Sequence, residues 1–442
     1  MESVLTRKTI ATYAIGSLGT GGFATLPGLV LVIYMTDTLG IAPLAAGILV
    51  TAAKVWDVII DPVIGARSDR SLALRGSRRP FMIAGALALP VFFILTFAVP
   101  AGTGPVVAGV WVLLAFLITA TAFSLFQVPY IALPAELASG YDDRTKLISA
   151  RVVVLTLAIL IFGGGAPEIQ KAFADPYTGY LVMAVVAGVL IGAGMLVSSF
   201  VARRGEPVAA ESFSILDNYR AGMAALRRSQ PFRSLLATFL LQGLATGLML
   251  AGAAYLSKWV LGTGVTVLFL SLIAPAILFA PVWAIVSRRI GKERAFTIAS
   301  ILFGVAALSM VVMLWAPGEW VYAPVALAGA GYAGMQSLPM SMLPDVISHD
   351  AERTGPGSAG TFGGVWTAGE TTGMALGSTV LTIVLAASGY LESVATVTVV
   401  QPPSAIAGII LAFSIVPAAI IALSLVTFAR YPLRKADIDA VR

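Results

Sequence analysis

The stretch Lys54-Val-Trp56-Asp57-Val-Ile-Ile-Asp61-Pro62 places one ammonium and two carboxylates inside a run that is otherwise apolar enough for a lipid bilayer. On a helix, Lys54, Asp57 and Asp61 stand at i, i+3 and i+7, so all three project from one face. Charges at membrane depth are costly, face a protein interior or a water-filled cavity, and often mark an ion or substrate pathway. A structural ion pair between helices needs only one acid. The second acid therefore favours a cation-binding site.

The rest of the chain is strongly apolar. Of its 442 residues, 58% are hydrophobic and 11% are charged, whereas a soluble domain carries about 25% charged residues. There is no cysteine and a single histidine, His349, which argues against disulfides, thiol nucleophiles and histidine metal clusters. We therefore expect a polytopic membrane protein without a cofactor. The net charge of +6 lies in short loops and does not indicate nucleic-acid binding.

Twelve stretches are long and apolar enough to cross a bilayer, since a spanning helix needs about 20 such residues. The expected spans are 10–35, 42–66, 80–101, 105–134, 147–166, 178–202, 232–260, 264–287, 295–316, 320–344, 361–388 and 403–429. The sequence thus predicts an all-α membrane protein of two six-helix bundles, 1–202 and 233–442. A cytoplasmic middle loop, 203–232, joins them and carries an amphipathic helix.

Basic residues gather in alternate loops. Five arginines follow the second span, and a similar basic turn, Arg288 to Arg294, follows the eighth. The positive-inside rule then puts both termini in the cytoplasm. We expect a monomer in a bacterial inner membrane, with the lipid bilayer and a small-molecule substrate as its partners.

These features resemble the major facilitator superfamily, which has two halves of six spans, a long central loop and an Asp69-Arg70 … Arg78-Arg79 turn after the second span. Within it, the Lys54 to Pro62 motif resembles the glycoside–pentoside–hexuronide:cation symporter group. Gln127-Val128-Pro129-Tyr130 and Leu343-Pro344-Asp345, the latter placed between spans ten and eleven, agree with that group. The resemblance covers nearly the whole chain and implies the major facilitator fold.

The resemblance also implies roles for individual residues. Asp57 and Asp61 match the carboxylates that bind the coupling cation, and Lys54 matches a basic residue beside them. Arg151 matches an arginine of the substrate cavity. The cytoplasmic gate motif falls on Asp69, Arg70, Arg78 and Arg79.

The chain departs from this group at the sugar-binding positions. Gly21 and Gln127 stand where the sugar transporters have acids, and Ile131 stands where an aromatic ring stacks on the sugar. Thr371 replaces a lysine that links the cation and sugar sites. The cation half of the site is kept while the sugar half has lost its carboxylates and its ring, so we expect a less polar solute.

Three other residues belong to the predicted site. Ser124 lies one helical turn before Gln127 and shares its face, so we expect it in the substrate cavity, together with Trp366. Glu370 is an acid at membrane depth beside Thr371. It either takes part in proton coupling or is a neutral glutamate that bonds a neighbouring helix. The coupling ion is H+ or Na+, and Glu370 favours H+; no metal beyond Na+ at Asp57 and Asp61 is expected.

The sequence therefore predicts a cation-coupled secondary active transporter for a small non-sugar amphipathic solute that is lipid-like, peptide-like or aromatic. A glycoside:cation symporter is the first alternative. A non-transporting receptor and an intramembrane enzyme are the others. The missing cysteine and the single histidine argue against the enzyme, and charges kept at membrane depth argue against the receptor.

Overall fold

The computed structural model describes residues 5–137, 141–202, 223–224, 226–354, 359–395 and 399–433. These residues form helices, with no strand among them beyond one isolated bridge between Leu39 and Val394. The predicted all-α class is confirmed, as expected where lipid cannot satisfy backbone N–H and C=O groups. Most of the predicted middle loop, including most of its amphipathic helix, lies outside the described residues.

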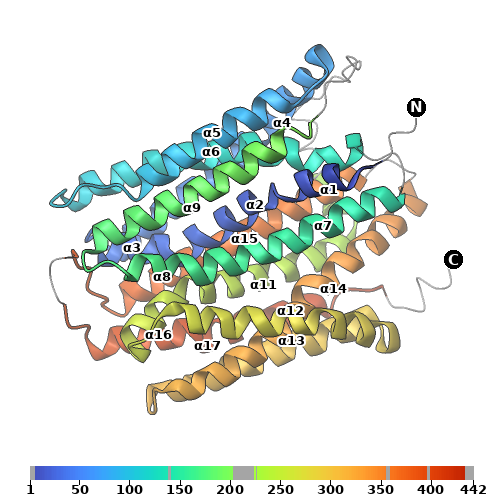
Figure 1. Cartoon of the computed structure of the whole chain (residues 1–442). Coiled ribbons are helices and arrows are strands. Elements are labelled where there is room, and N and C mark those ends of the chain that lie inside the picture. The colour runs from blue at the N-terminus through green and yellow to red at the C-terminus, as the bar shows by residue number, and fades with distance from the viewer. Residues whose placement is uncertain are drawn as a thin grey trace. The chain divides into compact units, whose positions relative to one another are not determined.

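Packing divides the chain into two units, and unit 1 comprises Met1–Ile215 with Glu392–Val399. Helix α5 packs against α6 and α9, and α4 packs against α6; α5, α6 and α9 run side by side in Figure 1. The helices of unit 1 are α1 (Arg7–Ala14), α2 (Ser17–Leu26), η1 (Pro27–Leu31), α3 (Val32–Asp37), α4 (Pro43–Arg75), α5 (Arg79–Thr96), α6 (Pro105–Leu137), α7 (Tyr141–Leu160), η2 (Ile161–Gly165), α8 (Ala166–Lys171) and α9 (Pro176–Ser199).

Unit 2 comprises Leu216–Leu391 with Val400–Arg442. Helix α11 packs against α15 and α17, and α14 packs against α12 and α13. The helices are α11 (Gln230–Tyr255), η3 (Leu256–Leu261), α12 (Val265–Ile290), α13 (Lys292–Ser309), η4 (Met310–Leu314), η5 (Glu319–Val321), α14 (Tyr322–Thr354), α15 (Ala359–Ala387), α16 (Pro403–Phe413) and α17 (Ile415–Phe428).

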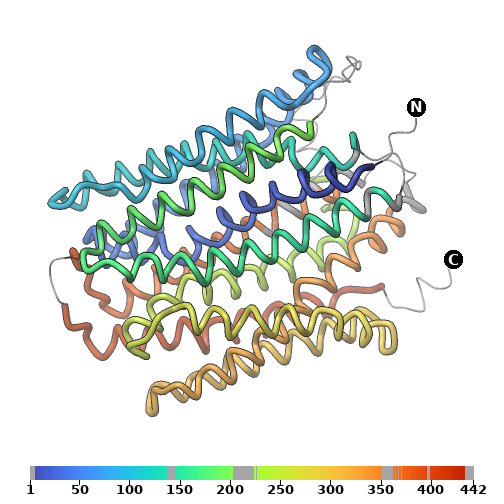
Figure 2. Tube along the Cα trace, in the orientation of Figure 1, coloured from blue at the N-terminus to red at the C-terminus, as the bar shows by residue number. Residues whose placement is uncertain are grey.

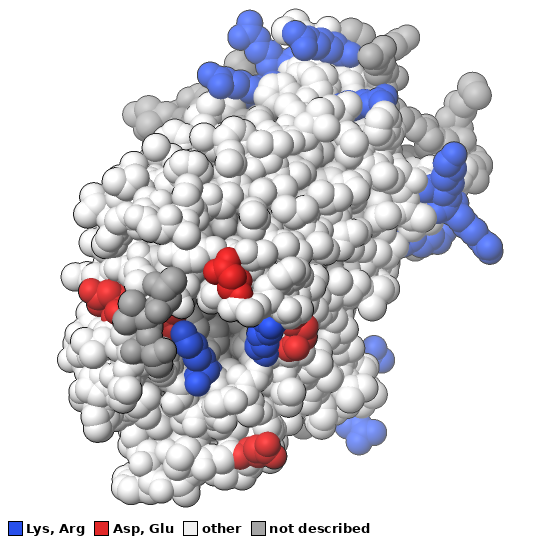
Figure 3. Space-filling model, turned by 60° about the vertical axis from the view of Figure 1, so that its left-hand side comes forward, with Lys and Arg blue, Asp and Glu red and all other residues white. Residues whose placement is uncertain are grey.

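Ten stretches among the described residues have the length and composition to cross a membrane. They correspond to the predicted spans one to nine and twelve. The tenth and eleventh are α14, with 33 residues, and α15, whose apolar part is Thr371–Ala387. Figure 3 shows broad uncharged areas, which suit contact with lipid, while the Lys, Arg, Asp and Glu side chains lie in separate groups at the edges and in the lower half of the view.

Several spans are interrupted or longer than predicted. Pro27 has no N–H for the carbonyl of Phe23, and at this residue the first span changes to the π-helix η1, which continues the same path in Figure 2. Pro417 likewise has no N–H for the carbonyl of Phe413, and the last span breaks between α16 and α17. Helices α4 and α14 end at Arg75 and Thr354, beyond the predicted ends at residues 66 and 344. The prediction counted only the apolar residues, whereas each helix continues through a polar stretch.

Glycines let helix backbones come close together. A Cβ atom on Gly247 of α11 would lie 2.1 Å from the carbonyl oxygen of Met374 on α15. A Cβ atom on Gly329 of α14 would lie 2.0 Å from the carbonyl oxygen of Leu272 on α12. Lipid gives no hydrophobic drive between helices, so close van der Waals packing at small residues holds such pairs together.

Gly329→Ala should therefore separate α12 from α14. We expect a loss of about 1–3 kcal/mol in stability, typical of overpacking in a filled interior, seen as a lower apparent Tm of the purified protein. Gly165→Ala is the control, because a Cβ atom there meets nothing within 4 Å. Equal Tm values for the two variants would contradict this account of the α12–α14 contact.

Candidate functional site

The three charged residues of the opening motif lie near the middle of α4, on one face. The Nζ atom of Lys54 lies 3.1 Å from Oδ2 of Asp57, and both side chains are partly exposed. Asp61 stands one turn further along the same face. The ion pair therefore involves Asp57, while Asp61 has a different contact, from α6.

Two side chains of α6 contact this part of α4. The side chain of Ser124, only 3% exposed, lies beside Asp61. One turn earlier, the hydroxyl of Thr121 accepts a hydrogen bond of 2.8 Å from Nε1 of Trp56. Ser124, predicted to line the substrate cavity, is thus a partner of the acidic pair. Sequence reasoning missed Thr121, although its spacing of three from Ser124 places both on one face of α6.

Asp57 and Asp61 can hold a small cation. The Oδ1 atom of each carboxylate is buried without a hydrogen-bond partner, which is costly unless another group satisfies it. Oxygen ligands suit a small hard cation, and a proton would also satisfy a buried carboxylate. The described residues contain no group of three or more His, Cys, Asp or Glu side chains that could hold a metal ion. The donor set fits H+ or Na+.

The positions expected to contact the solute lie on α2 and α6. The Thr20 hydroxyl donates a hydrogen bond of 2.7 Å to Oε1 of Gln127, so the polar end of Gln127 is tied to α2. Ile131, one turn beyond Gln127, shares its face and is exposed. Gly21 packs against α7, where a Cβ atom would lie 2.6 Å from the Cβ atom of Ala158. Gly21 thus lets α2 approach α7 closely, and its place in the substrate cavity stays a prediction.

Arg151 on α7 contacts an aromatic cluster from α1 and α6. Its Cζ atom lies 5.4 Å from the ring centroid of Tyr130, within range of a cation–π interaction. The Tyr130 ring stacks on Tyr13 with centroids 4.8 Å apart, and its hydroxyl donates to the carbonyl of Tyr13 at 2.9 Å. The cluster holds the Arg151 guanidinium, whose Nε atom is buried without a partner.

The predicted residues of unit 2 lie on α15. Trp366 is 2% exposed, stacks on Phe239 with centroids 4.4 Å apart and donates Nε1–H to the sulfur of Met340 at 3.1 Å. Trp366 is therefore buried within unit 2, and its place in the substrate cavity stays a prediction. Thr371 is exposed, and its hydroxyl donates to a carbonyl one turn earlier. The side chain of Glu370 lies outside the described part of the chain, so its role stays a prediction.

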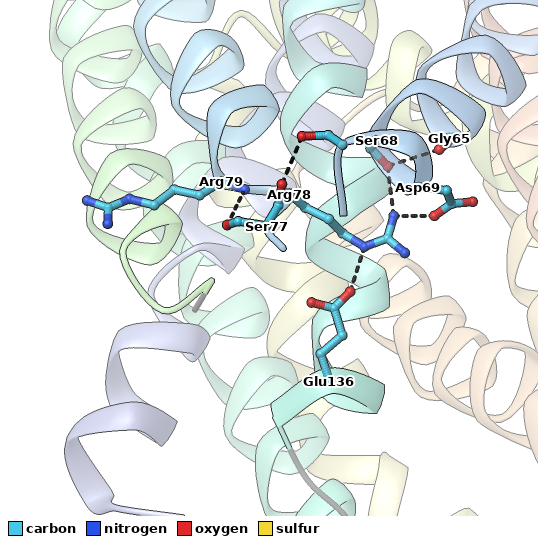
Figure 4. A network of polar contacts seen from close by, with 8 residues as sticks. Gly65, Ser68, Asp69, Ser77, Arg78, Arg79 and Glu136 are labelled. Carbon is cyan, nitrogen blue, oxygen red and sulfur yellow. Dashed lines mark hydrogen bonds and ion pairs between the residues drawn. The ribbon is translucent and has the colours of Figure 1, made fainter. Parts of the chain in front are cut away.

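The gate motif forms a network around Arg78 that joins α4 to α6 (Figure 4). Arg78 forms an ion pair with Asp69 and donates from Nε to Glu136 at 2.6 Å. A guanidinium nitrogen also donates to the hydroxyl of Ser68 at 2.8 Å. The planar guanidinium serves three partners at once, which a lysine cannot do with the same geometry.

The two neighbouring arginines of the motif lie apart from this network. Arg79 points away from Arg78 in Figure 4, and its Cζ atom lies 4.2 Å from the ring centroid of Phe200. Arg70 is exposed on α4. Of the four residues predicted for the gate, the structure therefore brings Asp69 and Arg78 together.

Unit 2 has related ion pairs that the sequence reasoning missed. Lys292, which opens α13, donates to Asp345 at 2.5 Å. Arg228 binds Asp350 through two hydrogen bonds of 3.1 and 2.5 Å. Both acids lie on α14, which the sequence reasoning ended at residue 344. In each unit a base near the start of one helix (α5, α13) pairs with an acid near the end of the next (α6, α14), and the repeated basic turn was the signal that could have revealed this.

The chain is similar to known membrane transporters over nearly its whole length. The sequence profile described as "MFS/sugar transport protein" matches residues 12–435. The glucuronide carrier protein homolog of Escherichia coli (strain K12) is 25% identical, over 98% of this chain and 94% of the relative. The sodium-dependent lysophosphatidylcholine symporter 1 of Gallus gallus is 26% identical, over 95% of this chain and 85% of the relative. The putative glycoside/cation symporter YagG of Escherichia coli (strain K12) is 23% identical over 99% and 94%.

Solved structures share the fold. One described as "Structural insights into substrate recognition in proton dependent oligopeptide transporters" has a TM-score of 0.68 and 13% identity, covering 98% of this chain and 99% of that chain. The nucleoside transporter NupG (D323A mutant) has a TM-score of 0.67 and 12% identity, covering 96% and 99%. At these identities the likeness concerns the fold alone.

Arg78→Lys should weaken the network of Asp69, Glu136 and Ser68, because one ammonium cannot reach all three partners. We expect a loss of about 1.5–3 kcal/mol, the range for hydrogen bonds to charged groups, measured as a lower Tm. Arg70→Lys, at an exposed position of the same motif, should leave Tm unchanged. If both variants melt like the wild type, the network does not stabilise unit 1.

Proposed function

Because the chain belongs to the MFS/sugar transport protein family and is a cation-coupled symporter rather than an enzyme, we propose that it moves a small solute by alternating access with H+ or Na+ bound at Asp57 and Asp61. The observation that carries this proposal is the pair of acids on one face of α4, each with a buried, unpartnered Oδ1 atom. Both termini lie in the cytoplasm of a bacterial inner membrane on this proposal, and the protein acts as a monomer.

The cation couples to the solute through the contact between α4 and α6. Asp57 and Asp61 are one helical turn apart, so their like charges repel until a cation neutralises them. Ser124, which lies beside Asp61, is on the same face of α6 as Gln127 and Ile131. A cation that draws Asp61 toward Ser124 therefore also positions the face of α6 that carries Gln127 and Ile131, and this face contacts the solute. By linkage, the solute must then tighten cation binding by the same factor.

The solute is a non-sugar amphipathic molecule on this proposal. A glycoside site needs several hydrogen-bonding groups on the solute face, but Gln127 is tied to Thr20 and the next residue on that face is the exposed Ile131. Arg151, with its unpartnered Nε atom, supplies a cationic donor for a polar head. The names of the relatives include both a lysophosphatidylcholine symporter and glycoside or glucuronide carriers, so a glycoside is the second candidate.

Asp57→Asn and Asp61→Asn should each abolish the response of the purified protein to its coupling cation. The wild type is expected to gain thermal stability when NaCl replaces choline chloride, or to change Tm with pH in the absence of Na+, because ligand binding stabilises the folded state. A gain in Tm with NaCl would identify Na+ as the coupling ion, whereas a change in Tm with pH in the absence of Na+ would identify H+. Both variants should remain folded, since losing one of two like charges relieves repulsion.

Asp143→Asn is the matched control for the cation experiment. Asp143 pairs with Lys146 near the start of α7, away from the acidic pair in sequence, and its variant should keep the wild-type response. A full cation response in both Asp57→Asn and Asp61→Asn would reject the acidic pair as the cation site.

Lysophosphatidylcholine and phenyl glucuronide distinguish the two solute classes. We expect saturable binding of the first, measured by calorimetry in nanodiscs, and none of the second. Ile131→Ala should weaken that binding about tenfold, because it removes apolar contact worth roughly 1.5 kcal/mol. Ile298→Ala is the control, since Ile298 on α13 is 48% exposed and Ile131 is 47% exposed. Saturable binding of phenyl glucuronide would instead show that the solute is a glycoside.

A further inference from the structure

Arg79 and Phe200 contact each other at one end of unit 1. Arg79 is the first residue of α5 and Phe200 follows the last residue of α9, and these two helices pack together. The Cζ atom of Arg79 lies 4.2 Å from the centroid of the Phe200 ring, within the range of a cation–π interaction. Phe200 is 56% exposed. The ring therefore holds the guanidinium at the outer surface of unit 1.

The charge of Arg79 is not neutralised by any acid that the structure describes. Its neighbour Arg78 takes both nearby carboxylates, Asp69 and Glu136, and Arg79 extends away from that network (Figure 4). The Nε atom of Arg79 is buried without a hydrogen-bond partner, and an arginine keeps its charge at any physiological pH. Two adjacent arginines thus differ, because one is paired within unit 1 and the other is an unpaired cation at its surface.

Arg79 lies at the level of the lipid headgroups. Helix α5 has 18 residues and is one of the stretches able to cross a membrane. Such a helix rises about 27 Å, close to the roughly 30 Å thickness of the hydrocarbon core. Its first residue is accordingly found where acyl chains give way to headgroups. Basic side chains at this level attract anionic lipids.

Apolar side chains lead away from this cation along both helices. Exposed residues recur at i, i+4, i+7 and i+11 on α5 and at i, i+4, i+8 and i+11 on α9, so each set forms a stripe on one face. We call these sets the α5 stripe (Pro80, Ala84, Leu87 and Val91) and the α9 stripe (Val189, Ala193, Val197 and Phe200). The helices touch closely, since a Cβ atom on Gly192 would lie 2.2 Å from Cγ of Pro90. Both stripes begin beside the Arg79–Phe200 contact and offer an apolar surface to acyl chains.

We propose that Arg79 and Phe200 form a binding site for an anionic phospholipid such as phosphatidylglycerol. The guanidinium binds the headgroup phosphate, because its planar set of N–H donors matches phosphate oxygens. The acyl chains lie along the α5 and α9 stripes. A zwitterionic lipid meets the same stripes, but its own ammonium group offsets the phosphate charge, so the site selects lipids with a net negative charge. The site lies within unit 1 and does not depend on the proposed cation role of Asp57 and Asp61.

Native mass spectrometry of the purified full chain tests the choice of headgroup. The protein is titrated with dioleoyl phosphatidylglycerol or with dioleoyl phosphatidylcholine, whose acyl chains are identical. Wild type should bind phosphatidylglycerol more tightly, and Arg79→Gln should weaken that binding about fivefold, the attraction expected of one basic side chain. Arg70→Gln is the matched control, because it removes the same charge from an exposed position at the same end of unit 1. No preference in the wild type, or equal losses in the two variants, would overturn the proposal.

The ring of Phe200 gives a second test that leaves Arg79 in place. Phe200→Ala should weaken phosphatidylglycerol binding about threefold, because the guanidinium loses its cation–π partner. Phe173→Ala is the control, since Phe173 is also exposed, at 39%, but precedes α9 and so lies at the other end of that helix. Equal affinities of these two variants would overturn the site even if Arg79→Gln failed to fold.

Thermal unfolding in nanodiscs distinguishes a lipid from a free anion. Replacing part of the phosphatidylcholine with phosphatidylglycerol should raise the apparent Tm of the wild type, since a ligand stabilises the folded state that binds it, and Arg79→Gln should remove the gain. Inorganic phosphate added to pure phosphatidylcholine nanodiscs should leave Tm unchanged, because it has no acyl chain to place on the stripes. A gain with phosphate as large as that with phosphatidylglycerol would overturn a lipid as the occupant. Asp61→Asn should keep the lipid response, so this site and the proposed cation site can fail separately.

Discussion

The cost of holding carboxylates inside an apolar span governs the organisation of unit 1. Asp57 and Asp61 cannot face lipid, so α4 must turn their face toward other protein groups. Lys54 supplies an opposite charge to Asp57, and the polar side chain of Ser124 on α6 lies beside Asp61. The α4–α6 contact is thus polar at its centre, and the two unpartnered carboxylate oxygens remain there as acceptors.

Apolar helices in lipid need attraction that the hydrophobic effect does not supply. Glycines supply part of this attraction, because they let helix backbones come into close van der Waals contact, as Gly247 and Gly329 do in unit 2. Buried hydrogen bonds add to it, such as the one from the Gln242 amide to the hydroxyl of Ser300 at 2.8 Å. Close backbone packing at glycines and a few buried side-chain hydrogen bonds thus hold the helices of unit 2 together.

Apart from the Lys54–Asp57 pair within α4, two ion pairs lie near helix ends, where charges cost less than at the centre of a span. Arg78 with Glu136 in unit 1 and Lys292 with Asp345 in unit 2 occupy related positions. The opposite end of unit 1 has instead backbone hydrogen bonds from Ser393 and Ala395 to Thr36 and Thr38. Backbone hydrogen bonds carry no net charge, so that pairing is less sensitive to salt than the ion pairs.

The sequence by itself determined the membrane class, the ten spans that the described residues confirm and the alignment of Lys54, Asp57 and Asp61, because apolar length and helical spacing are local properties. It also placed Asp69 and Arg78 in one motif. Only the tertiary structure decided which helix each face meets. It put Ser124 beside Asp61, turned Gly21 toward α7, buried Trp366 on Phe239 and paired Val394 with Leu39. Those partners are distant along the chain, and spacing within one helix contains no information about the helix across from it.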